Sequence, residues 1–367
     1  MTAMRWTDSP APAQTAAYGP PRTSLYLMKS WHLNGPGVGL DGLTLRQREI
    51  PNPGRGEVLL RVHATSLNYR EILILKYGRY PLPVKPDAVA LCDGAGEVVA
   101  LGEDTGRVKV GERVIASIFP HWLDGPFAGG SAPQLGGSLD GLLTEYAVLP
   151  EQALLPIPEH LSYEEAATLP CAAVTAWNAL AGGARPLQAG DDVLTLGSGG
   201  VSLFALQLAK AAGARVIATT STDQKAERLR ALGADQVVNY HRVSEWGAEV
   251  RRLTGGVGVQ HVVEVGGGST MPHSLKAVAT AGNLGLVGSV GGGPSLIDGS
   301  EVFLSGAVLR PVIAGSRAQL ASVVRAVALH RIRPVIARVF AFNDASAALA
   351  WYAGSHAVGK TVIRVDA

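Results

Sequence analysis

Residues 192–202 read Asp192-Val-Leu-Thr-Leu-Gly197-Ser198-Gly199-Gly200-Val201-Ser202, and this stretch decides the fold. Its first five residues predict a short buried strand, and a helical pattern begins directly after the glycines. Glycines at such a junction let the backbone turn sharply and approach a phosphate closely, while the helix N-terminus offers free N–H groups. The stretch therefore predicts a loop that binds a pyrophosphate. The alternative is an ordinary strand-to-helix turn without a ligand.

Strands and helices alternate downstream of this loop. The predicted strands are residues 192–196, 215–219, 236–239, 259–264 and 283–287, and the predicted helices are residues 201–212, 223–232, 244–253, 269–277 and 318–329. Short buried strands that alternate with amphipathic helices are typical of a parallel sheet with crossover helices. The predicted fold class is therefore α/β, with a doubly wound parallel Rossmann sheet.

The chain before residue 158 has a different character. It is rich in turns, with predicted strands at residues 24–29, 43–49, 57–64, 95–101, 113–117 and 143–149, and one short helical segment at residues 69–77. Ser162 and Glu165 form a capping-box pattern that predicts the start of a helix. Two predicted C-terminal strands, residues 338–341 and 361–365, are expected to rejoin this first region.

The end of the second strand of the alternating region indicates which nucleotide binds. An Asp or Glu at this position usually accepts a hydrogen bond from a free ribose 2′-hydroxyl. Here the chain has Thr220 and Ser221, with Lys225 just beyond. Ser221 and Lys225 can bind a 2′-phosphate, so NADPH is favoured over NADH, although Lys225 could equally be a solvated helix residue. Asp223 is interpreted as a helix N-cap.

The composition excludes several classes of protein. A chain of 367 residues, 47% hydrophobic and 17% charged, is long enough for two domains with substantial cores. A net charge of +2 gives no basic field for nucleic acid, and two cysteines exclude a disulfide framework. Residues 1–22 lack the apolar core of a signal peptide and are interpreted as a disordered tail. No apolar run is long enough for a membrane span, so a soluble cytoplasmic protein is expected.

These motifs resemble those of the medium-chain dehydrogenase/reductase superfamily. The resemblance rests on residues 169–177, 197–202, 205–221, 232–235 and 359–363, in the family's order. It implies a GroES-like β-barrel domain at residues 23–157, completed by residues 335–367, and a Rossmann domain at residues 158–334. It also implies that a small-molecule substrate binds in the cleft between them, and that the protein is a homodimer, with a tetramer as the alternative, in which the sheet extends through the segment near residues 308–313.

The resemblance also indicates whether the chain binds a catalytic zinc ion. Zinc alcohol dehydrogenases of this superfamily bind their catalytic zinc through Cys, His and Cys. This chain has Asn68, Cys92 and Cys171 at those positions and lacks the four cysteines of the structural zinc lobe. Asn68 is a poor zinc ligand, and Ser66-Leu-Asn-Tyr-Arg70 resembles the zinc-free quinone and enoyl reductase branch. No zinc is therefore expected. A residual metal site at Cys92, Cys171 and an acid remains the alternative to two small buried side chains.

The expected activity is NADPH-dependent transfer of a hydride, without metal, to a conjugated C=C bond or a quinone. Such chemistry needs a hydrogen-bond donor for the substrate oxygen, and the candidates are Asn68 and Tyr69, each of which could instead be structural. Arg70 and Glu71 are interpreted as a local ion pair. The alternatives are an alcohol dehydrogenase or aldehyde reductase of the same superfamily, and a nucleotide-binding protein without turnover.

The resemblance assigns the remaining site residues. The substrate pocket is expected to contain Cys92, Asp93, Trp122 and Cys171, with further walls at Phe127, Leu135 and Phe303. The expected cofactor-binding residues are Thr175, Gly197, Ser198, Gly199, Gly200, Val201, Thr220, Ser221, Lys225, Tyr240, Gly266, Gly288, Val290 and Lys360.

Overall fold

The computed structural model describes residues 27–128, 133–290, 297–354 and 357–365. The tail predicted for residues 1–22 and the start of the first predicted strand lie outside these residues. Within the described part of the chain, no helix has both the length and the apolar character that a membrane span requires.

A six-stranded parallel sheet forms the core of the central part of the chain, in the order β10-β9-β8-β11-β12-β13. Its strands are β8 (Asp192–Leu196), β9 (Arg215–Thr220), β10 (Gln236–Asn239), β11 (Val259–Glu264), β12 (Val278–Leu286) and β13 (Val308–Pro311). The chain builds outward from β8 to one edge and from β11 to the other, so the direction of winding reverses between these two strands. This arrangement confirms the predicted Rossmann sheet.

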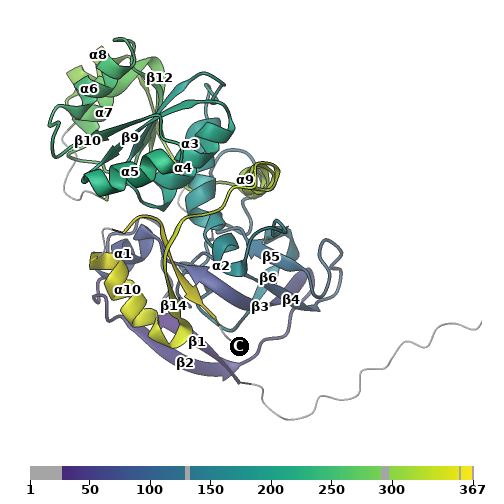
Figure 1. Cartoon of the computed structure of the whole chain (residues 1–367). Coiled ribbons are helices and arrows are strands. Elements are labelled where there is room, and N and C mark those ends of the chain that lie inside the picture. The colour runs from purple at the N-terminus through teal and green to yellow at the C-terminus, as the bar shows by residue number, and fades with distance from the viewer. Residues whose placement is uncertain (1–26, 129–132, 291–296, 355–356, 366–367) are drawn as a thin grey trace, which may run out of the picture.

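Helices cover both faces of this sheet, which Figure 1 shows at the top of the molecule. One face packs against α3 (Val174–Ala181), α4 (Gly200–Ala211), α5 (Asp223–Ala231) and α9 (Arg317–Leu329), and the other against α6 (Trp246–Leu253) and α7 (Met271–Ala277). Val193 and Leu194 point to opposite faces, and both are fully buried. Such burial on both sides explains why consecutive residues such as these are both apolar, rather than alternating with polar ones.

A second, mixed sheet has the order β14-β15-β3-β4-β5-β7, with β6 paired to β3, and a hairpin of β1 and β2 beside it. The hairpin consists of β1 (Leu27–Leu33) and β2 (Leu43–Glu49). The N-terminal strands of the mixed sheet are β3 (Glu57–Ser66), β4 (Ala95–Leu101), β5 (Arg113–Ala116), β6 (Tyr146–Pro150) and β7 (Leu154–Pro156). Between β3 and β4 lies the short helix α1 (Tyr69–Leu75).

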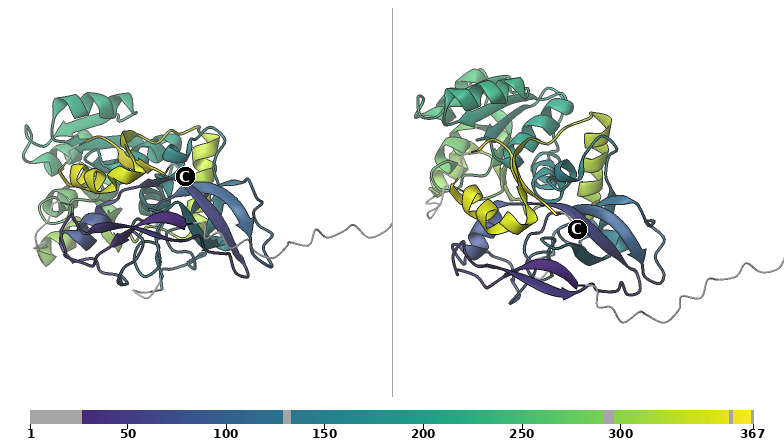
Figure 2. Two further views of the ribbon diagram at one scale, coloured as in Figure 1. Left: turned by 90° about the horizontal axis from the view of Figure 1, so that it is seen from below. Right: turned by 60° about the horizontal axis from the view of Figure 1, so that its bottom comes forward.

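The C-terminal strands join this N-terminal sheet, as predicted. β15 (Lys360–Arg364) pairs antiparallel with β3, and β14 (Ile336–Ala341) pairs with β15. Figure 1 shows the yellow β14 next to the blue N-terminal strands, with α10 (Ala345–Gly354) beside them and near α1, and Figure 2 shows the same part of the molecule from two further sides. The return of the chain brings Lys360 to the end of β3.

Several local predictions needed correction. Ser162 and Glu165 do form a capping box, but α2 (Tyr163–Ala166) is only one turn long. The following segment is a π-helical turn, η3 (Leu169–Ala173), before α3 begins. Asp223 is not the N-cap of α5, because Thr222 caps it through its own hydroxyl. The patterns do not predict α8 (Gly299–Ser305) or the alanine-rich α10, which has no polar face.

Candidate active site

A cleft of about 1640 Å³ lies between the two sheets, and residues of both line it. We call the part formed by residues that follow β8, β9, β10 and β12 the nucleotide half. The substrate half is formed by α1 and the residues around Phe119–Phe127, together with Cys171 and Tyr352. The described lining contains no Asp or Glu side chain, whereas five cationic side chains contribute to it: Arg70, Lys76, Lys225, Arg310 and Lys360. Arg70 and Lys360 are paired with buried carboxylates, so the positive charge that favours an anionic ligand comes from Lys76, Lys225 and Arg310.

The predicted pyrophosphate loop lies at the floor of the nucleotide half. Gly197 follows β8 with φ of 75°, a conformation that favours glycine, and Gly199 is the N-cap of α4 with no side-chain hydrogen bond to the helix. A Cβ atom on Gly199 would meet no atom within 4 Å, so open space faces the N-terminus of the helix. The Ser202 hydroxyl donates to the Leu196 carbonyl at 2.6 Å, which packs α4 closely on β8. The loop thus has room and free donors for a diphosphate.

The end of β9 is arranged for a second anion. Ser221, Lys225 and Tyr240 all line the cleft, and the Tyr240 backbone N–H donates to the Thr220 carbonyl at 3.0 Å. Burial lowers the pKa of Lys225, and among the described residues no carboxylate forms an ion pair with it. Asp223 is engaged elsewhere, because its carboxylate binds Arg242 and accepts a hydrogen bond from Asn239.

The other predicted cofactor residues mostly share this lining. Thr175, Gly200, Val201, Gly288, Val290 and Lys360 are among the residues that face the cleft. Gly266 is not, because the residue of that loop that reaches the cleft is Val265. Gly266 instead donates its backbone N–H to the buried carboxylate of Glu264 at 2.8 Å, which shapes the turn after β11.

Asn68, Asp93 and Lys360 form a buried network at the junction of the two halves. The Lys360 ammonium donates to Asn68 Oδ1 at 2.5 Å, to the Leu67 carbonyl at 2.6 Å, and lies 3.3 Å from Asp93 Oδ2. The Asn68 amide nitrogen donates to the same Asp93 oxygen at 2.9 Å. The stem of Lys360 also packs over Gly200, because a Cβ there would lie 2.6 Å from Lys360 Cδ. One lysine therefore connects the pyrophosphate loop to the substrate half.

Cys92, Asp93 and Cys171 lie together beneath the substrate half. The two sulfurs and one Asp93 carboxylate oxygen all lie within 4.8 Å of one another. Leu91, just before them, has φ of 64°, a strained conformation that a buried leucine rarely adopts. A hydrogen bond to Cys171 and burial raise the pKa of the Cys92 thiol well above its usual range. Cys171 lines the cleft, whereas Cys92 and Asp93 are fully buried below it.

One oxygen of this cluster has no partner. Asp93 Oδ2 accepts from Ser66 at 2.6 Å as well as from Asn68, but the buried Oδ1 has no hydrogen bond within the described structure. The cluster thus presents two thiols and a free carboxylate oxygen, which are donor types that zinc accepts. The Lys360 ammonium on the same carboxylate opposes a divalent cation by its charge.

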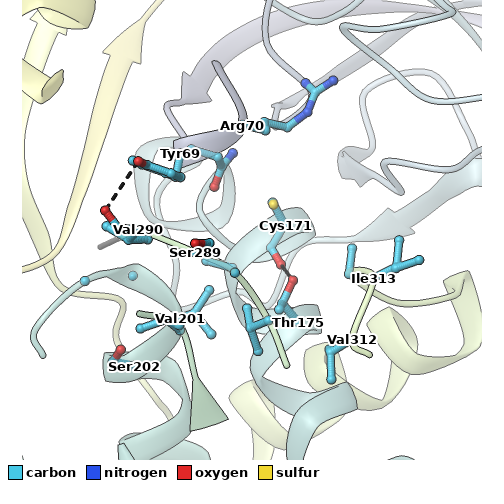
Figure 3. A pocket seen from close by; sticks show the side chains of 18 of the residues that line it. Tyr69, Arg70, Cys171, Thr175, Val201, Ser202, Ser289, Val290, Val312 and Ile313 are labelled. Atoms are coloured by element: carbon cyan, nitrogen blue, oxygen red, sulfur yellow. Dashed lines mark hydrogen bonds between the residues drawn. The ribbon is translucent and has the colours of Figure 1, made fainter. Parts of the chain in front are cut away.

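Tyr69 extends from α1 across the cleft to the nucleotide half, where its hydroxyl donates to the Val290 carbonyl at 3.4 Å (Figure 3). Burial and the neighbouring Tyr77 raise the pKa of Tyr69 above that of a free tyrosine. Arg70, next to Tyr69 on α1, pairs with the buried Glu71 at 3.0 Å, which confirms the predicted local ion pair.

Aromatic side chains form the outer wall of the substrate half. The rings of Phe119, Trp122 and Phe127 pack edge to face, with centroids 5.0–5.8 Å apart. Trp122 and Phe127 line the cleft as predicted, but Leu135 is buried behind the wall. The prediction for Phe303 was wrong: it lies on α8 with 84% of its surface exposed, outside the cleft.

Sequence reasoning missed several lining residues. These include Tyr77, Tyr80, Phe119, Arg310 and Tyr352. Tyr80 packs against the Arg70 guanidinium at 5.0 Å, and Tyr352 comes from α10 near the C-terminus. No local pattern marks them, because their position depends on contacts between segments far apart in the chain.

Comparisons with known protein families agree with this architecture. Residues 54–159 match the family described as alcohol dehydrogenase GroES-like domain, and residues 200–328 match the family described as zinc-binding dehydrogenase. The chain is 41% identical, over 89% of its length and 96% of the relative's, to a zinc-type alcohol dehydrogenase-like protein of Schizosaccharomyces pombe.

More distant relatives carry different activities in their names. An acryloyl-coenzyme A reductase of Metallosphaera sedula is 28% identical over 88% of this chain and 96% of its own length. A chloroplast envelope quinone oxidoreductase homolog of Arabidopsis thaliana is 36% identical over 58% of this chain and 61% of its own length. Among solved structures, a putative alcohol dehydrogenase from Sinorhizobium meliloti matches with a TM-score of 0.83 and 38% identity, over 92% of this chain and 98% of that one.

Proposed function

The chain belongs to the medium-chain dehydrogenase/reductase superfamily of oxidoreductases, and on that basis we propose that it uses NADPH to reduce a conjugated C=C bond or a quinone without a metal ion. The observation that carries the proposal is the cleft itself. Its described lining is cationic and free of carboxylates, a glycine loop opens at a helix N-terminus, and aromatic rings wall the opposite half. This combination suits a polyanionic dinucleotide beside a flat, apolar substrate.

The choice of NADPH is supported by the end of β9. A ribose 2′-hydroxyl is usually recognised by a free carboxylate, but Asp223 is neutralised by Arg242 and held by Asn239. Lys225 faces the cleft without an acidic partner among the described residues, and Ser221 lies beside it in the lining. A 2′-phosphate would supply the missing counter-charge for Lys225.

The proposal treats the Cys92–Asp93–Cys171 cluster as a poor fit to zinc. Two of its members are thiols, and the third is a carboxylate that already faces the Lys360 ammonium at 3.3 Å. A divalent cation would therefore have to bind beside a buried positive charge. Asn68, at the first ligand position of zinc relatives, directs its amide nitrogen toward Asp93 rather than offering a lone pair.

The chain's own residues can support the reaction in the following way. When bound, NADPH would supply a hydride to an electron-poor carbon of the substrate, negative charge would develop on the substrate's carbonyl oxygen, and a proton taken up from solvent would complete the reduction. The Tyr69 hydroxyl would exchange its long hydrogen bond to the Val290 carbonyl, 3.4 Å, for one to that oxygen. The rings of Phe119, Trp122 and Phe127 exclude water from the reacting face.

We propose a different contribution for Asn68. Both ends of its amide are already bonded, to Lys360 and to Asp93, so its free hydrogen-bonding capacity toward a substrate is small. Its backbone N–H also donates to the Glu71 carboxylate at 2.7 Å. Asn68 therefore fixes the start of α1, and so the position from which Tyr69 extends.

A second candidate function is alcohol and aldehyde interconversion. The specific observation in its favour is the unpartnered Asp93 Oδ1 beside two thiols, because these are the donors a catalytic metal would need. A metal at this cluster would polarise a substrate carbonyl oxygen in place of Tyr69.

One substrate separates the two candidates, because trans-2-hexenal offers both a conjugated C=C bond and an aldehyde. The purified protein is incubated with NADPH and trans-2-hexenal, and the product is identified by mass and retention time. Our proposal predicts hexanal. The formation of 2-hexenol would contradict it and favour the second candidate.

We also propose that the protein is a homodimer. β13 is the edge strand of the parallel sheet, and its Val308 side chain is 52% exposed. Phe303 and Leu304 on the adjacent α8 are 84% and 80% exposed, an apolar surface that a monomer rarely presents. Sedimentation equilibrium should give twice the mass of the chain, and Val308→Lys should shift the protein toward the monomer.

A further inference from the structure

We propose that Cys92 and Cys171 form a redox-sensitive dithiol, which a small hydroperoxide oxidises to a disulfide at the floor of the cleft. The two sulfurs lie within 4.8 Å of each other, although the residues are far apart in the sequence. Both thiols are free in this structure. The inference concerns a modification of this chain and does not depend on which substrate the cleft accepts.

The two thiols differ in exposure, so each has a different role in the oxidation. Cys171 lines the cleft, and Figure 3 shows its sulfur on the cleft side of the turn that carries it. Cys92 has no exposed surface, so a dissolved oxidant meets Cys171 first. A reachable thiol beside a buried one is the arrangement in which the first is oxidised and the second resolves it.

The backbone around both thiols is fixed independently of them. The Thr175 hydroxyl donates to the Cys171 carbonyl at 2.6 Å, within the π-helical turn η3. On the other side, the left-handed conformation of Leu91 sets the direction of Cys92, and the Leu91 carbonyl accepts the Leu142 N–H at 2.8 Å. The thiols are therefore held next to each other by the fold rather than by a bond between them.

The reaction balances with one hydroperoxide. The Cys171 sulfur attacks the peroxide, the O–O bond breaks, and Cys171 becomes a sulfenic acid while an alcohol or water leaves. The Cys92 thiol then attacks the Cys171 sulfur, an S–S bond forms, and water leaves with the remaining thiol proton. Two thiols lose two electrons in total, and the hydroperoxide gains them.

The disulfide would join two parts of the molecule. Cys92 belongs to the core of the mixed-sheet region, whereas η3 contacts both α4 of the parallel-sheet region and β5 of the mixed sheet. Oxidation would tie these regions together and remove a thiol from the cleft lining. If the proposed function holds, turnover of trans-2-hexenal should fall on oxidation and return after treatment with dithiothreitol.

The test uses the whole chain, which contains only these two cysteines. Any disulfide within one chain must therefore join Cys92 to Cys171. The reduced protein is treated with a small excess of hydrogen peroxide, and its intact mass and free thiols are measured. We expect the loss of two hydrogen atoms (about 2 Da), no remaining free thiol, and full recovery with dithiothreitol.

Two matched variants separate the roles of the thiols. In Cys92→Ser the accessible Cys171 has no resolving partner, so it should gain oxygen atoms irreversibly. In Cys171→Ser the buried Cys92 should stay reduced under the same conditions. If either variant does not fold, the mass and thiol measurement on the wild-type protein still tests the proposal.

Three results would overturn the proposal. They are a wild-type protein that gains oxygen atoms without losing hydrogens, a disulfide that forms only between chains, and purified protein with one bound metal ion per chain that keeps both thiols unreactive. The mass measurement does not depend on turnover. If the protein forms the disulfide but does not reduce trans-2-hexenal, the proposed function is refuted and the proposal of a redox-sensitive dithiol still holds.

Discussion

The two halves of the cleft are built in different ways. The nucleotide half comes largely from short stretches at strand ends, in which Gly197–Val201 and Ser221–Lys225 follow directly after β8 and β9. The substrate half brings together Tyr69, Trp122, Cys171 and Tyr352 from four distant parts of the chain. Backbone groups dominate the first half and side chains the second.

This difference indicates that cofactor binding and substrate specificity depend on different features of the fold. A diphosphate is bound by main-chain N–H groups and a helix terminus, which a short glycine motif provides on its own. A substrate is positioned by side chains whose relative placement depends on the whole fold. Lys360 is the exception, because its stem packs on Gly200 while its ammonium binds Asn68 and Asp93.

The largest effect is therefore expected where the halves meet. Lys360→Met would leave the Asp93 carboxylate buried without its ion pair, which should lower the free energy of unfolding by about 3–5 kcal/mol. Urea denaturation measures this loss. Adding Asp93→Asn should recover part of it, because the unpaired charge is then removed; no recovery would mean that Lys360 stabilises the fold by packing alone.

Next in size is the effect of Tyr69→Phe in the substrate half. Without its hydroxyl, kcat for enal reduction should fall by about 100–1000-fold, the usual effect of losing one oxyanion donor. The Kd for NADPH should stay unchanged. Because the pKa of Tyr69 is raised, the wild-type rate should not decline through this group below about pH 10.

The control for this variant is Tyr146→Phe, which removes a hydroxyl outside the cleft. Equal losses in both variants would contradict the role.

In the nucleotide half, Lys225→Ala should weaken NADPH binding by about 10–100-fold, the effect of one charge-assisted hydrogen bond. Affinity for NADH should not change, because that cofactor lacks the 2′-phosphate. Isothermal titration with both nucleotides measures the ratio. Arg228→Ala removes a charge from an exposed position of the same helix and should leave both affinities unaltered. A parallel loss for NADH would exclude recognition of the 2′-phosphate.

The smallest effect should come from Gly199→Ala. The added methyl group meets no atom within 4 Å, and φ at this position is −76°, so thermal stability should change little. The same methyl group would stand where a diphosphate approaches, so the Kd for NADPH should rise about tenfold. A loss of stability with unchanged affinity would show that this glycine serves the fold rather than the ligand.

The same contrast explains how much the sequence predicts. β8, β10 and β11 were predicted with their observed ends, because each is a short run with buried valines that is followed by a helix pattern. The loop residues Gly197–Val201 lie in the cleft as expected, since a local motif specifies them. The return of the C-terminal strands to the N-terminal region was predicted from their β pattern, and the pairing of β15 with β3 confirms it.

The substrate half is less predictable for a physical reason. Phe303 was expected in the cleft but lies on exposed α8, and Tyr352 was missed because α10 lacks a helical polar pattern. Likewise, the bonds of Asn68 to Lys360 and Asp93 join residues 68, 93 and 360. No sequence window contains all three residues, so only tertiary packing shows that the Asn68 amide is already bonded.

The most direct test of the central claim is turnover without metal. The purified protein is dialysed against a strong zinc chelator, its metal content is measured by mass spectrometry, and NADPH-dependent reduction of trans-2-hexenal is followed before and after. The account predicts less than one metal ion per ten chains, hexanal as the product, and an unchanged rate. A rate that disappears on dialysis and returns with added zinc would contradict it and assign the chemistry to a metal at Cys92, Asp93 and Cys171.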